Sequence, residues 1–103
     1  MNPYAGEVTL RVDGNDYVCK LTLGALAELE SRLETGSLVE LIKRFEAGSF
    51  SSKDVLALCV AGLRGGGWKG SETDLLTAEI QGGPVGAAKA AAVLLARAFA
   101  PPD

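Results

Sequence analysis

Few residues in this chain have the types and spacing that catalysis or metal binding requires. The sequence contains no histidine, which removes Ser-His-Asp and Cys-His arrangements and most zinc sites. Its two cysteines, Cys19 and Cys59, stand 40 positions apart and form no C-x-x-C motif. Two thiols supply at most two metal ligands, so we expect buried free cysteines in a reducing cytoplasm, with no metal and no cofactor.

Two further patterns could carry chemistry but are better explained in other ways. Glu30 and Glu34 are spaced i, i+4 on an expected helix and could hold a cation or form an acid/base pair. No other polar group converges on them, so a solvated helix face is favoured. The glycine-rich segment 65–71 follows a helix instead of a strand and lacks the G-x-x-x-x-G-K-[ST] order of a phosphate-binding loop. The sequence therefore predicts that the protein is not an enzyme.

Four apolar residues are candidates for binding a partner protein. Trp68, the single tryptophan, stands on the glycine-rich loop, where it could anchor a partner or fold back over the core. Phe50 could also contact a partner, or it could pack as a hydrophobic staple into the helix that follows it. Leu95 and Phe99 are the other two candidates, and both belong to the apolar stripe of the last expected helix.

The elements that must position these residues begin with a β-hairpin over residues 7–21. A type II′ turn with Gly14 and Asn15 at its centre would place Val12 opposite Tyr17. In this register six apolar side chains share one face of the hairpin: Val8, Leu10, Val12, Tyr17, Cys19 and Leu21. A two-stranded hairpin is marginally stable in water, so this face must pack against helices.

Helical periodicity and capping residues predict five helices after the hairpin. Thr22 and Ser37 are the expected N-caps of the first two, and Ser51 and Ser71 begin capping boxes at the third and fourth. Glycine or proline residues stop the later helices. The last helix has an apolar stripe at Val85, Ala88, Ala92, Leu95 and Phe99. The predicted helices cover about residues 23–34, 38–47, 52–64, 72–81 and 84–100.

Length and composition favour one domain over residues 1–103, of the α+β, mainly α class, with the N-terminal β-hairpin packed on a bundle of about five helices. The hydrophobic content of 48% suits a packed core. The net charge of −3 lacks the basic footprint of a nucleic-acid binder. No apolar run approaches the ~18–20 residues of a membrane span, and the first residues lack a signal-peptide pattern. We therefore expect neither nucleic-acid nor membrane binding.

The chain as a whole resembles the gene transfer agent family of small phage-tail proteins. The residues that carry the resemblance are the segments 2–8, 21–30, 36–38, 45–54 and 61–65, in this order and at compatible spacing. Together they extend over about residues 2–99. The family belongs to the tail-morphogenesis gene clusters of gene transfer agents and related tailed phages, and its members are described as tail assembly chaperones or, in older usage, as tail tube proteins.

The resemblance implies a non-catalytic role in the morphogenesis of the tail and of the virion. Tail assembly chaperones bind the tape-measure protein, a long helical chain that sets tail length, and keep it soluble until tail tube subunits polymerise around it. The expected partners are thus the tape-measure protein, tail tube subunits or both, with weak self-association. The expected location is the cytoplasm of the bacterial host, with absence from the mature particle. A permanent structural minor tail protein is the alternative. A third hypothesis is a small regulatory or nucleic-acid-associated protein, which the net acidity disfavours.

Overall fold

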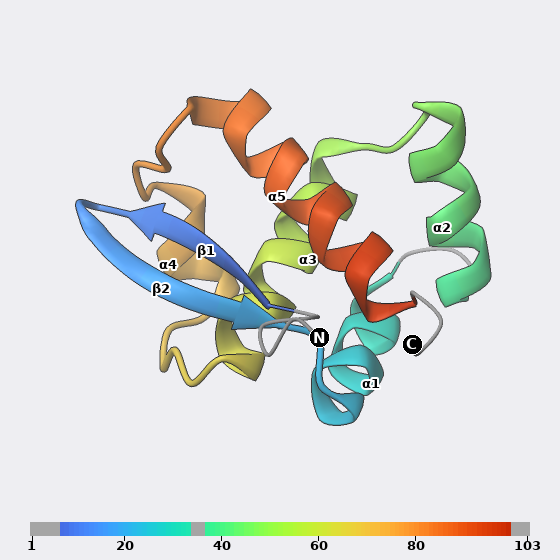
Figure 1. Ribbon diagram of the computed structural model, residues 1–103, viewed down its shortest axis with the longest axis horizontal. Helices are drawn as coiled ribbons and strands as arrows, with labels where there is room; N and C mark the ends of the chain where they lie inside the picture. Colours follow the sequence, from blue (N-terminus) through green and yellow to red (C-terminus); the bar gives the residue numbers. More distant parts are fainter. Residues whose placement is uncertain (1–6, 34–36, 100–103) are drawn as a thin grey trace, which may run out of the picture.

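The computed structural model describes residues 7–33 and 37–99, and it confirms the predicted α+β, mainly α class. Glu34 and Ala100, which the predicted helices 23–34 and 84–100 include, lie outside the described residues. Figure 1 shows a two-stranded hairpin on one side of a group of helices, with α5 crossing in front of α3. The elements are β1 (Glu7–Val12), β2 (Asn15–Lys20), α1 (Leu23–Arg32), α2 (Leu38–Ala47), α3 (Ser52–Gly65), α4 (Glu72–Leu76) and α5 (Gly83–Ala98).

The predicted register of the hairpin is wrong by two residues, although the predicted apolar face is right. Asp13 and Gly14 form the two-residue turn, with Val12 opposite Asn15. Both central residues have positive φ, 51° and 83°, which is typical of a type I′ turn. A shift of two residues preserves the alternation of faces. The six apolar residues therefore still share one face, where Leu10, Val12 and Cys19 are buried and Val8, Tyr17 and Leu21 are partly buried.

Helix α3 is the centre of the molecule, with β2, α1, α4 and α5 packed around it. Its residues 57–63 are all buried, so its apolar surface is not confined to one stripe. This is the expected pattern for a helix that is enclosed on several sides. At its C-terminal end the backbone of β2 comes very close, because a Cβ atom on Gly66 would lie 1.8 Å from the Val18 carbonyl oxygen.

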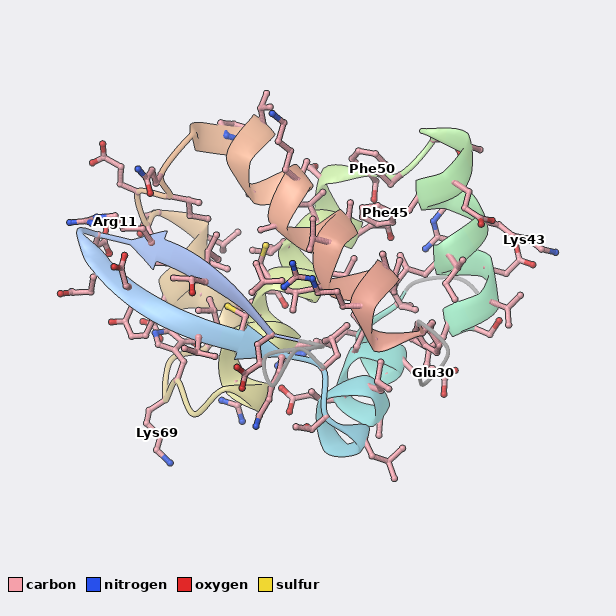
Figure 2. The ribbon with its side chains drawn as sticks, in the orientation of Figure 1. Arg11, Glu30, Lys43, Phe45, Phe50 and Lys69 are labelled. Atoms are coloured by element: carbon pink, nitrogen blue, oxygen red, sulfur yellow. The ribbon has the colours of Figure 1, made fainter. Side chains whose placement is uncertain are left out.

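Helix α2 is attached to the N-terminal end of α3 by a bidentate ion pair. Arg44 donates from Nε and Nη2 to the two carboxylate oxygens of Asp54, each at 2.9 Å. Asp54 also accepts from the backbone N–H of Ser51 at 2.9 Å, which completes the predicted capping box of α3. The rings of Phe45 and Phe50 stack with their centroids 4.4 Å apart. Figure 2 labels both residues and shows them close together.

The predicted helix 72–81 is too long, because α4 ends at Leu76. The chain beyond it runs along the outer edge of β1. Asp13 donates its backbone N–H to the Glu79 carbonyl at 2.8 Å, and Gln81 donates to the Arg11 carbonyl at 3.0 Å. A backbone that donates to and accepts from a strand edge cannot continue its own helical ladder, and this tertiary pairing overrides the local helical pattern.

Candidate partner-binding groove

An apolar groove of about 720 Å³ lies between α3, α4 and α5 and is here called the α3–α4–α5 groove. The N-terminal half of α3 forms one wall, α4 and the segment after it form another, and the first turns of α5 close the end. Its apolar lining consists of Phe50, Val55, Leu56, Leu75, Leu76, Ala78, Ile80, Pro84, Ala87 and Ala88.

Local sequence explains why this groove is open. Helix α4 has only five residues, so it covers less of α3 than a longer helix would. Gly82 and Gly83 both have positive φ, 84° and 64°, which turns the chain sharply into α5. Leu75 is buried beneath the groove, but Leu76 beside it keeps 62% of its surface exposed. An exposed leucine next to an apolar groove is a feature of protein-interaction surfaces.

The four residues predicted to bind a partner do not come together. Phe50 lines the α3–α4–α5 groove. Trp68 lies at the opposite end of α3, where it is half-buried and borders a separate cleft of about 400 Å³ next to α1. Leu95 is only 4% exposed and belongs to the core, whereas Phe99 is 46% exposed at the C-terminal end of α5. Of these four, Phe50 is thus the residue that the groove includes.

The predicted apolar stripe of α5 is rotated relative to the buried face. Ala87, Ala91, Leu94 and Leu95 are buried, whereas Val85 from the predicted stripe is 65% exposed. The nearly uniform apolar composition of α5 hides its orientation, because almost any choice of stripe looks amphipathic. The groove residues Leu75, Leu76 and Ile80 were missed for a related reason, since their helical spacing assigned them to the core.

Several charged side chains outside the groove form ion pairs that link α1 to α3 and α4. Glu28 accepts from Arg64 at 2.8 Å and from Arg32 at 3.2 Å, which links α1 to the end of α3. Arg32 also donates to Glu72 on α4 at 3.0 Å. Glu30, the described member of the predicted acid pair, accepts from the backbone of Leu38 at 3.4 Å. Figure 2 shows Glu30 at the periphery of the molecule.

The two cysteines are buried free thiols. Burial raises the pKa of Cys19 to about 12, and that of Cys59 to about 11. Among the described residues no three His, Cys, Asp or Glu side chains gather in a way that could hold a metal ion. No helix in the described part of the chain has the length and apolarity needed to cross a membrane. The lining of the α3–α4–α5 groove is mostly apolar, so the contact that it offers is chiefly apolar.

Comparison with known families agrees with the resemblance seen in the sequence. The family model described as phage tail tube protein, GTA-gp10, matches residues 5–101. The chain therefore belongs to this family of tail proteins from phages and gene transfer agents. No curated protein and no solved structure matches the chain.

Proposed function

We propose that this protein is a non-catalytic tail assembly chaperone. It binds the tape-measure protein, tail tube subunits or both during tail morphogenesis, in the cytoplasm of the bacterial host, and it is absent from the finished particle. Membership in a phage-tail family supports a role in this process. The observation that carries the proposal is the apolar α3–α4–α5 groove with exposed Leu76 on its rim.

A groove of this kind suits an amphipathic helix, which would insert apolar side chains spaced i, i+3, i+4 and i+7. The tape-measure protein, as a long helical chain, would offer many such segments. Each site needs only modest affinity, because several copies on one extended chain act together. The groove is lined chiefly by apolar groups, so we expect the binding to depend weakly on salt.

A permanent structural role is the second candidate, and the family description as a tail tube protein favours it. A tube subunit that forms a continuous sheet with its neighbours needs free strand edges. In the described residues the hairpin edges are already occupied in part. The Arg11 carbonyl on β1 accepts from Gln81 at 3.0 Å, and the Val18 carbonyl on β2 lies against Gly66. This arrangement supports the chaperone over a ring built by strand pairing.

The proposal is tested by co-expression with the tape-measure and tail tube proteins encoded nearby, followed by affinity capture. We expect at least one of them to be retained and kept soluble. Leu76→Glu, which places a charge on the groove rim, should raise the dissociation constant about tenfold, equal to ~1.4 kcal/mol, and so reduce the retained amount. The matched control is Leu23→Glu, because Leu23 is 84% exposed on α1 and lies outside the groove. Equal retention of the partner by the two variants would show that the partner does not bind in the groove.

The composition of purified particles separates the two candidate functions. A chaperone should be missing from them, whereas a structural subunit should be present at a fixed ratio to other tail proteins. Presence at a ring-like ratio, together with no capture of either partner, would overturn the chaperone proposal.

A further inference from the structure

Charged residues are distributed unevenly around the α3–α4–α5 groove. Its lining includes two of them, Lys53 on the first turn of α3 and Glu79 on the segment that follows α4. From residue 70 to residue 88 the sequence contains three acidic residues and no basic one. This stretch includes α4, the segment after it and the first turn of α5. The wall formed by α4 and the segment after it is therefore acidic, whereas the basic lining residue stands on the α3 wall.

The acidity of the α4 wall extends to the turn of the hairpin. The carboxylate of Asp13 accepts from the backbone N–H of Glu79 at 2.9 Å, so both acidic residues belong to this wall. Glu79 is exposed, and its carboxylate has no ion-pair partner among the described residues. Two basic side chains near this wall are already paired: Arg32 with Glu72 at 3.0 Å, and Arg11, at the tip of the hairpin in Figure 2, with Asp16 at 3.6 Å. An excess of negative charge thus remains on this side of the groove.

The groove is long enough for two turns of a bound helix. Along α3 its lining extends from Lys53 to Cys59, which is about 9 Å at 1.5 Å per residue. A second helix would insert apolar side chains at i, i+4 and i+7 over this length. The residues that border such an apolar stripe lie on the two flanks of the helix, so one flank of a bound helix faces α4.

We propose that the partner helix carries lysine or arginine residues along the flank that faces α4, an inference that rests on the proposed function of the groove. Apolar contact supplies the affinity, whereas the acidic wall selects the charge of the flank. Reversing the helix in the groove exchanges its two flanks, so basic residues on one flank favour one direction of binding. The net charge of −3 on the whole chain also favours a basic partner.

Two synthetic helical peptides test the charge preference of the full chain. Both have leucines at i, i+4 and i+7, and they differ in three residues on one flank, which are lysine in one peptide and glutamate in the other. At 50 mM salt, fluorescence anisotropy should show about tenfold tighter binding of the lysine peptide, because each exposed charge pair contributes a small factor. At 1 M salt, where the Debye length is about 3 Å, this ratio should fall below about threefold. Equal affinity for the two peptides at 50 mM salt overturns the proposal.

Charge reversal at Glu79 tests whether the α4 wall makes the selection. Glu79→Lys should lower the ratio from about tenfold to about twofold, since attraction of the basic flank becomes repulsion. Glu46→Lys is the matched control, because Glu46 is an exposed glutamate on α2, outside the groove, and the substitution changes the net charge equally. This control should keep most of the preference. Equal effects of the two substitutions would indicate a response to net charge alone and overturn the proposal.

A neutral substitution on the groove rim separates this inference from the proposed function. Leu76→Gln removes apolar contact without adding charge, so it should weaken the binding of both peptides by a similar factor of about five and keep their ratio. If neither peptide binds, or if Leu76→Gln does not weaken binding, the groove is not a helix site and both proposals fail. If Leu76→Gln weakens binding but the two peptides have equal affinity for the wild type, the charge preference alone is refuted.

Discussion

The ion pair between Arg44 and Asp54 is expected to be the strongest polar contact that holds α2 in place. Arg44→Met removes the charge and both hydrogen bonds while it keeps a long apolar stem. Asp54 is only 7% exposed, so the variant leaves a nearly buried carboxylate that still accepts hydrogen bonds from Ser51 but has lost its bidentate Arg44 partner. Removing one member of a buried pair costs ~3–5 kcal/mol. The Arg44 side chain is 24% exposed, and we therefore expect a smaller loss, of about 2–3 kcal/mol.

Arg11→Met is the matched control, because it breaks an ion pair that is exposed to solvent instead of largely buried. Arg11 lies 3.6 Å from Asp16, and both side chains are about half exposed or more. Exposed pairs contribute little, since water screens the charges and the side chains lose entropy when they are held together. We expect this variant to lose less than about 0.5 kcal/mol.

The pH dependence of the Arg44→Met variant provides a second, independent check. Burial alone would raise the pKa of Asp54, but hydrogen bonds from Arg44 and Ser51 hold the pKa of this carboxyl below its ordinary value of 3.8. A pKa lowered by folding stabilises the protein above the unfolded-state pKa, and this contribution is lost as the pH falls through the folded-state value. Without Arg44, burial dominates and the pKa of Asp54 rises. The cost of the substitution should then be largest near pH 7 and should shrink toward pH 3, where the carboxyl is protonated in the variant.

Urea unfolding followed by far-UV circular dichroism measures both effects. Circular dichroism is the suitable probe because it detects the loss of α2, whereas Trp68 fluorescence reports on the opposite end of α3. Wild type and both variants are compared at pH 7 and near pH 3. The reasoning is refuted if Arg44→Met costs no more than Arg11→Met at pH 7, or if its cost is the same at both pH values.

Three further outcomes are expected from the packing. Gly66→Ala should destabilise the fold by more than about 3 kcal/mol or prevent folding, because the new Cβ would lie 1.8 Å from the Val18 carbonyl oxygen. Gly24→Ala should instead raise the melting temperature, with a gain of about 0.5–1 kcal/mol in the free energy of unfolding. The new Cβ would have its nearest neighbour 4.0 Å away, so it fits without a clash. Thermal unfolding measures both variants. Cys19 and Cys59 should resist a disulfide reagent at pH 8 in the native state and react fully in denaturant, because burial raises the pKa of each thiol; rapid native reaction would contradict the buried placement.

The parts of the fold that were predictable from the sequence are those fixed by local chemistry. Alternation of apolar residues identified the buried face of the hairpin, and Thr22, Ser37 and Ser51 each accept from the backbone N–H three residues ahead. Caps and apolar faces depend on residues within one or two turns, so a sequence pattern contains the information.

The remaining parts depend on contacts between distant segments. The α4 helix stops early because residues 79–81 bond to β1, and nothing within residues 72–81 signals this. The hairpin turn, in contrast, was predictable from the local sequence, because Asp13-Gly14 is a strong type I′ pattern. The register was predicted wrongly because Gly14 was placed at the first position of a type II′ turn. The groove was missed because it arises where α3, α4 and α5 fail to cover one another, and only the tertiary arrangement reveals it.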